Sequence, residues 1–128
     1  MTMTFINLPV RDLTTAAEFY RALGFTSDQA DLGGDIVQIA ISDSTRLMLH
    51  LRSTFEAYTG VATTDTEASR EVILGLSTQS RERVDELVDR AVVAGGEPLG
   101  PGMTSGPMYM RGFRDIDGHQ WSFLHMAG

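Results

Sequence analysis

The residues best suited to chemistry in this sequence are its histidines and carboxylates, because the usual nucleophiles are missing. The chain contains no cysteine, which excludes thiolate catalysis, zinc–thiolate sites and disulfides. It has no Gly-x-Ser-x-Gly motif, and its glycine-rich stretch LGPGMTSGP lacks the lysine of a phosphate-binding loop. His50 lies in the segment RLMLHL, which is typical of a strand. There it would be a hydrogen-bonded core or rim residue, or else a functional group.

Length, composition and charge indicate a single globular domain. The chain has 128 residues, 42% of them hydrophobic, and a formal net charge of −7. This acidic balance argues against nucleic-acid binding, which requires basic residues to neutralise phosphates. No stretch reaches the roughly 18 consecutive apolar residues of a membrane span, and the first residues do not resemble a signal peptide. Together with the lack of cysteine, these features predict a cytoplasmic protein without membrane or nucleic-acid partners.

The first half of the chain has the pattern of a strand, a helix and three strands. The segment MTFINLPV predicts the first strand, and the helix that follows can begin at Asp12 or Thr14 and end at Gly24. Its apolar residues recur with helical spacing at Leu13, Ala16, Ala17, Tyr20 and Leu23. Strands are then expected at 25–31, at DIVQIAIS after the glycines at 33–34, and at RLMLHL. A short helical turn around residues 55–58 completes this half.

The second half repeats the order. EVILGLS (71–77) predicts a strand, and SRERVDELVDRAVVAGG predicts a helix with an apolar face made of Val84, Leu87, Val88, Ala91 and Val92. EPLG is a possible short strand and PGMTSGP is a Gly/Pro loop, and the stretch LGPGMTSGP is interpreted as a mobile lid or linker. MYMRGF and HQWSFLHM are two strands joined by a tight turn at RDIDG. The repeat predicts two modules, 1–58 and 70–128, with a linker at 59–69.

The two patterns together resemble the vicinal oxygen chelate superfamily, which includes glyoxalase I, bleomycin-resistance proteins and extradiol dioxygenases. The resemblance is carried by the first strand followed by V-x-D-L, by FY-x-x-LGF, and by the terminal D-x-D-G-H-x-W. It implies an α+β fold of two βαβββ modules that form a cupped, mostly antiparallel sheet. It also implies a homodimer and a ligand or metal ion within the cup.

Enzymes of this superfamily hold one divalent metal ion through the first and last strands of each module. Carried over residue by residue, those positions fall on Phe5, Met48, Glu71 and Ser122. A phenyl ring has no lone pair, a thioether is a soft ligand, and a serine hydroxyl is a weak neutral donor. With one carboxylate in the set, we expect no bound metal and no other cofactor. A divalent metal is the alternative, with His50 and Glu71 converging on it through water.

The resemblance therefore predicts a metal-free protein that binds a small, partly apolar molecule in the cup. The expected ligand-binding residues are Phe5, Met48, His50, Glu71, Met108, Met110 and Ser122. Methionine suits such a site because its side chain adapts to irregular apolar shapes. Arg111 and Arg114 are candidate partners for the Glu71 carboxylate. The alternative is an enzyme: a metal-dependent lyase or dioxygenase, or a metal-free isomerase-like catalyst with Glu71 as its base.

Overall fold

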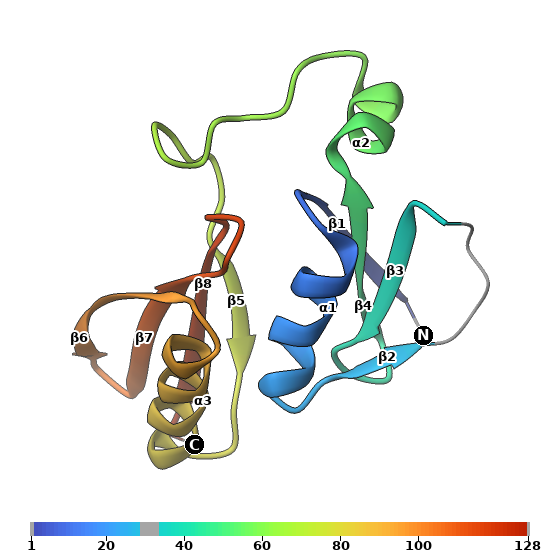
Figure 1. The fold of residues 1–128 in the computed structure, drawn as a ribbon. Helices are drawn as coiled ribbons and strands as arrows, with labels where there is room; N and C mark the ends of the chain where they lie inside the picture. The colour runs from blue at the N-terminus through green and yellow to red at the C-terminus, as the bar shows by residue number, and fades with distance from the viewer. Residues whose placement is uncertain (1, 29–33, 128) are drawn as a thin grey trace. The chain divides into compact units, whose positions relative to one another are not determined.

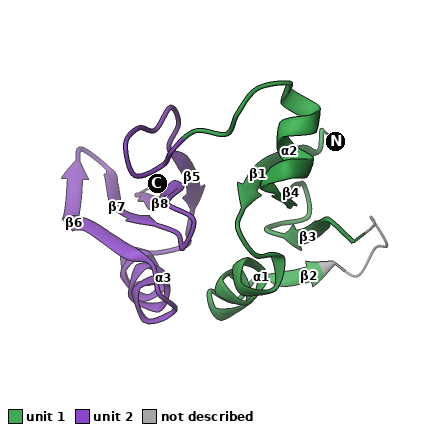
Figure 2. Ribbon diagram, turned by 45° about the horizontal axis from the view of Figure 1, so that its top comes forward, with its two compact units in different colours: residues 1–64 green, residues 65–128 purple. Residues whose placement is uncertain are grey.

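The computed structural model describes residues 2–28 and 34–127, and the chain forms two compact units (Figure 2). Unit 1 covers residues 1–64 and unit 2 covers residues 65–128. Each unit contains a four-stranded sheet in which one strand pairing is parallel and two are antiparallel. The prediction of an α+β fold made of two βαβββ modules is confirmed. In the part of the chain that is described, every helix is too short or too polar to cross a bilayer.

Unit 1 follows the expected order and ends in a full helix where a short helical turn was expected (Figure 1). Its elements are β1 (Thr4–Val10), α1 (Leu13–Ala22), β2 (Thr26–Asp28), β3 (Ile36–Ala40), β4 (Thr45–Leu51) and α2 (Arg52–Thr59). The strands are arranged in the order β1-β4-β3-β2. The expected strand at 25–31 is seen as β2 up to Asp28, and the rest of it, with Gly33, lies outside the described residues.

The core of unit 1 lies between α1 and one face of the sheet. The Asp12 carboxylate accepts a hydrogen bond from the backbone N–H of Thr15 at 3.1 Å, which confirms Asp12 as the helix cap. Gly24 follows the helix with φ +101°, a conformation that favours glycine. Apart from Leu13, which is half-buried, the helix stripe and the alternate residues of the central strands are buried together: Leu8, Val10, Ala16, Ala17, Tyr20, Leu23, Ile39, Leu47 and Leu49.

Helix α2 is longer than the short helical turn expected around residues 55–58. It begins directly after β4 at Arg52, has no side-chain cap at its start, and ends at Gly60 in the left-handed conformation with φ +78°. None of its side chains is fully buried. It contacts β1 and β4, so its residues stand beside the ends of these strands.

Unit 2 has the same order of strands and helix. Its elements are β5 (Leu74–Ser77), α3 (Arg81–Val93), β6 (Glu97–Ser105), β7 (Met108–Arg114) and β8 (Gln120–Met126). The sheet order is β5-β8-β7-β6, with β5 parallel to β8. Helix α3 is capped by Ser80, whose hydroxyl accepts from the backbone N–H of Arg83 at 3.0 Å. The expected stripe of α3 is buried except for Val92, which is 37% exposed because it lies at the edge of the stripe in the last turn.

Two expectations for unit 2 are wrong. The strand at 71–77 begins at Leu74, so residues 71–73 precede it. The stretch PGMTSGP is largely strand rather than a lid or linker, because β6 continues to Ser105 and pairs with β7 across a short turn at Gly106. The register shifts between Leu99 and Met103, where Gly102 allows the Tyr109 ring to lie against the backbone.

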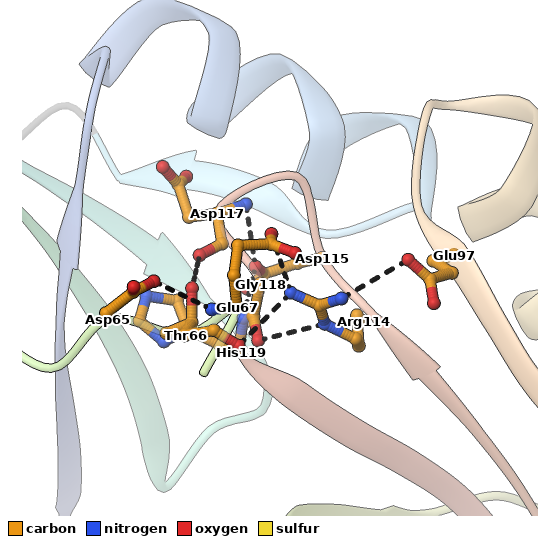
Figure 3. A network of polar contacts seen from close by, with 9 residues as sticks. All are labelled: Asp65, Thr66, Glu67, Glu97, Arg114, Asp115, Asp117, Gly118 and His119. Atoms are coloured by element: carbon orange, nitrogen blue, oxygen red, sulfur yellow. Dashed lines mark hydrogen bonds and ion pairs between the residues drawn. The ribbon is translucent and has the colours of Figure 1, made fainter. Parts of the chain in front are cut away.

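The tight turn between β7 and β8 is held by the Asp115 carboxylate (Figure 3). It accepts hydrogen bonds from the backbone N–H groups of Asp117 and His119 at 3.0 and 2.9 Å, and from the indole N–H of Trp121 at 3.0 Å. Asp115 is 5% exposed and Trp121 is 1% exposed. The D-x-D-G-H-x-W sequence is thus a structural unit, because one buried carboxylate satisfies three donors.

Arg114 joins this turn to the segment that precedes β5. Its guanidinium donates to the backbone oxygens of Gly118 and Thr66, and forms ion pairs with Glu67 at 2.9 Å and Glu97 at 3.3 Å (Figure 3). The Thr66 hydroxyl donates to the backbone oxygen of Asp117 at 2.7 Å. Ion pairs and hydrogen bonds therefore hold residues 65–67, at the start of unit 2, against the β7–β8 turn of the same unit.

Candidate functional site

The candidate site is a pocket of about 670 Å³ in unit 1, a volume in the usual range for small-molecule sites. Two groups of residues form its walls, one from the sheet and one from α2. They are Asn7, Ile36, Met48 and His50 from the sheet, and Phe55, Tyr58 and Thr59 from α2. None of these described residues is a lysine, arginine, aspartate or glutamate. His50 is the one side chain among them that would become positively charged on protonation.

Strand pairing positions the sheet residues of the pocket. In β4, Leu47 and Leu49 point to the core with α1, so Met48 and His50 point to the opposite face. Asn7 of β1 lies opposite Met48, and Ile36 of β3 lies opposite His50. These neighbours therefore share the pocket face.

Helix α2 supplies the other wall by its spacing. Phe55, Tyr58 and Thr59 are three and four positions apart, so they lie on one side of the helix. The rings of Phe55 and Tyr58 stand edge-on to the His50 imidazole, with centroid distances of 6.1 and 5.7 Å.

His50 is the most constrained polar group of the pocket. It is 5% exposed, and its Nε2 lies 2.8 Å from the Asn7 side-chain oxygen. Its Nδ1 is buried and, among the described residues, has no hydrogen-bond partner. Burial lowers the pKa of His50 below its ordinary value of 6.5, because the charged imidazolium is poorly solvated there.

This lowered pKa predicts a pH dependence of stability. Between pH 7 and 5 the unfolded chain takes up a proton at this residue more readily than the folded chain does, so stability falls as the pH falls. The slope contributed by His50 is expected to remain below about 1.4 kcal/mol per pH unit, the limit for one proton. Urea unfolding at several pH values measures it. His50→Gln should flatten the curve, since His119 and His125 are common to both proteins, and an unchanged slope would contradict the assignment.

The structure brings Met48 and His50 together in this pocket, and it leaves Phe5 outside the residues that line it. Phe5 is 53% exposed and lies opposite Arg46 in the register. Asn7, two residues further along the same face of β1, is the residue beside Met48. Sequence reasoning missed Asn7, Ile36, Phe55, Tyr58 and Thr59, although strand alternation from Phe5 could have suggested Asn7.

The ligand-binding residues expected in unit 2 lie on β7 and β8, except for Glu71. Met108 and Met110 share the face of β7 that carries Gly112, and Gly112 lies opposite the buried Ser122. Glu71 is exposed and precedes β5, and Gly75 is the residue that pairs with Ser122. The other face of the strands carries Tyr109, which donates to Asp85 of α3 at 2.7 Å.

The expected partners of Glu71 are engaged elsewhere. Arg111 forms ion pairs with Asp85 at 3.4 Å and Asp89 at 3.0 Å. Arg114 pairs with Glu67 and Glu97, as described above. The expectation that either arginine neutralises Glu71 is therefore wrong, because acidic residues on α3 and beside the β7–β8 turn already occupy both guanidinium groups.

The residues at the superfamily's metal positions do not fit a divalent ion. These positions are Phe5 and Met48 in unit 1 and Glu71 and Ser122 in unit 2, and neither pair is a pair of strand neighbours, because Met48 lies opposite Asn7 and Ser122 lies opposite Gly75. They supply a phenyl ring, a thioether, one exposed carboxylate and a hydroxyl, and the strand neighbours Asn7 and Gly75 add only an amide. Across residues 2–28 and 34–127 there is no group of three or more His, Asp or Glu side chains that could hold a metal.

Residues 2–123 match the family model of the glyoxalase/bleomycin resistance protein/dioxygenase superfamily. Hypothetical protein SA1046 from S. aureus is 31% identical, with a TM-score of 0.86 over 98% of this chain and 94% of that one. A glyoxalase-related enzyme from Fulvimarina pelagi is 24% identical, with a TM-score of 0.81 over 98% and 88% of the two chains. A comparison with curated proteins found no match.

Proposed function

Because this chain belongs to the glyoxalase/bleomycin resistance protein/dioxygenase superfamily, we propose that it binds a small, partly apolar molecule in the pocket of unit 1 without a divalent metal ion. The pocket itself is the observation that carries this proposal. Its walls are mainly apolar and aromatic, with the polar Asn7–His50 pair at one position. Binding sites for small organic molecules commonly combine apolar walls with a few placed polar groups.

The pocket residues favour an aromatic ligand of two or three rings. Met48 contributes a polarizable thioether, which packs well against aromatic rings. Phe55 and Tyr58 contribute ring faces and edges that can pack against a flat molecule. The volume of about 670 Å³ leaves room for such a molecule.

The binding proposal predicts that 2-methoxynaphthalene raises the melting temperature of the protein. A ligand that binds only the folded state stabilises it by RT ln(1 + [L]/Kd). Tyr58→Ala is expected to weaken binding by roughly three- to tenfold, because an aromatic contact contributes about 0.5–1.5 kcal/mol. Tyr58 is 72% exposed, so the variant should fold normally. Melting curves over a ligand concentration series give both dissociation constants.

Val61→Ala is the matched control, since Val61 is 68% exposed in the same unit and does not line the pocket. It should leave the melting shift unchanged, and so should added EDTA. A shift that EDTA abolishes would favour the metal-dependent lyase or dioxygenase instead. No shift with neutral aromatic compounds, or a shift insensitive to Tyr58→Ala, would contradict binding in this pocket.

Several expectations from the sequence stay predictions. They are the module boundaries at 58 and 70, the homodimer, the cytoplasmic location, the absence of a cofactor and the metal-free isomerase-like role of Glu71. The expected contributions of Phe5, Glu71, Met108, Met110 and Ser122 to a ligand site also stay predictions.

A further inference from the structure

We propose that the pocket selects neutral aromatic ligands that carry a hydroxyl or N–H donor, and that Nδ1 of His50 accepts the hydrogen bond from this donor. The inference rests on the proposed binding function and specifies the class of ligand. It follows from the hydrogen bonding of the Asn7–His50 pair and from the charge of the pocket walls.

The orientation of Asn7 determines which imidazole nitrogen carries the proton. The Asn7 side-chain nitrogen lies 3.5 Å from the backbone oxygen of Phe5, to which it can only donate. The Asn7 side-chain oxygen therefore faces His50 and can only accept, so Nε2 of the imidazole must donate across the 2.8 Å contact. A flipped amide would place two acceptors against each other at Phe5. In the neutral imidazole, Nδ1 is then a bare acceptor.

This acceptor has no partner in the described part of the chain. Nδ1 of His50 is closed off from solvent and makes no hydrogen bond there, and buried acceptors of this kind are uncommon in folded proteins. The imidazole nevertheless lines the pocket. A ligand that brings a donor to Nδ1 would satisfy it, whereas an apolar ligand of the same shape would leave it unsatisfied.

Because Nδ1 is closed off from solvent, a ligand donor reaches it only when neighbouring side chains move. The rings of Phe55 and Tyr58 stand edge-on to the imidazole, and the Tyr58 side chain is 72% exposed. Exposed side chains change rotamer within nanoseconds, so the Tyr58 ring can swing outwards as a ligand enters. The ring would then pack on the ligand instead of on His50.

The lack of charged side chains among the described lining residues favours a neutral ligand over an ionic one. None of the described lining residues is a lysine or arginine that could pair with an anion, and none is an aspartate or glutamate that could pair with a cation. A charged ligand would lose its hydration without gaining a partner. A hydroxyl or N–H group on an aromatic ring requires only the single acceptor.

The test compares 2-naphthol with 2-methoxynaphthalene, which keeps the oxygen but lacks the donor. We expect 2-naphthol to bind the wild-type protein about tenfold more tightly, a typical value for one well-made hydrogen bond. In His50→Gln this ratio should fall to near one, and the affinity for 2-methoxynaphthalene measures separately what the loss of the imidazole ring costs. The nitrogen of the Gln amide can still donate to Asn7, and its oxygen, the acceptor that remains, lies one bond further along the side chain than Nδ1.

A second measurement does not depend on a variant. The ¹⁵N resonance of His50 Nδ1 should move on addition of 2-naphthol and stay in place with 2-methoxynaphthalene. Equal affinities for the two compounds, or a ratio that persists in His50→Gln, would overturn this inference while leaving the binding function intact. If neither compound binds, the proposed function fails and this inference fails with it.

Discussion

Replacing Gly118 with alanine is expected to lower the free energy of unfolding by roughly 3–5 kcal/mol. Gly118 has φ +85°, which an L-residue with a side chain rarely adopts. A Cβ atom would also lie 2.3 Å from the Thr66 hydroxyl oxygen and 2.7 Å from a terminal nitrogen of Arg114. Both partners belong to the contact that attaches residues 65–67, so they could not move without losing their hydrogen bonds. Urea unfolding followed by the fluorescence of Trp121 measures the effect.

Gly100→Ala is the matched control for this substitution. Gly100 has φ +82°, close to that of Gly118, but a Cβ atom there would meet nothing within 4 Å. Its cost should be limited to backbone strain, about 1–2 kcal/mol. Equal losses for the two variants would show that the packing of Thr66 and Arg114 against the turn contributes nothing.

Replacing Asp115 with alanine is expected to cost roughly 3–5 kcal/mol, because three donors lose their acceptor at once. These are the backbone N–H groups of Asp117 and His119 and the indole N–H of the buried Trp121. Each buried donor left unpaired costs about 1–3 kcal/mol, and the turn can recover part of this by admitting water. The loss is measured by urea unfolding, with Trp121 fluorescence also reporting on the local environment.

Two further variants test whether the stability loss of Asp115→Ala comes from the hydrogen bonds of its buried carboxylate. Asp115→Asn keeps one acceptor oxygen and should lose less stability than Asp115→Ala. Asp65→Ala removes a single hydrogen bond, to the backbone N–H of Glu67, on the exposed surface, so its cost should remain within about 1 kcal/mol. An Asp115→Ala variant as stable as Asp65→Ala would contradict the role assigned to the buried carboxylate.

These substitutions lie in unit 2, whereas the candidate pocket lies wholly in unit 1. The D-x-D-G-H-x-W sequence that carries the family resemblance therefore acts on the fold in this chain. Its aspartate, glycine and tryptophan form one turn, held by a carboxylate and fitted to Thr66 and Arg114. Ligand binding should depend on other residues, of which Met48 and His50 were expected from the sequence.

The amino-acid sequence by itself determined the elements whose signals are local. Asp12 through its side chain and Gly24 through its backbone mark the ends of α1, and the apolar stripes of α1 and α3 follow from helical spacing. The order of strands and helices followed from the same signals, and the family resemblance that this order supports implied the fold class. The β7–β8 turn was evident because aspartate and glycine are needed there for local reasons.

Only the tertiary structure decided which residues meet. The Asn7–His50 pair spans 43 positions along the chain, and it depends on the parallel register of β1 and β4. The start of β5 at Leu74 places Gly75 beside Ser122 and leaves Glu71 outside the strand. A strand pattern repeats every two residues, so it specifies a face but not a neighbour, and a shift along the strand changes every contact. The pocket is made of such contacts, and for that physical reason its composition could not be deduced from the sequence alone.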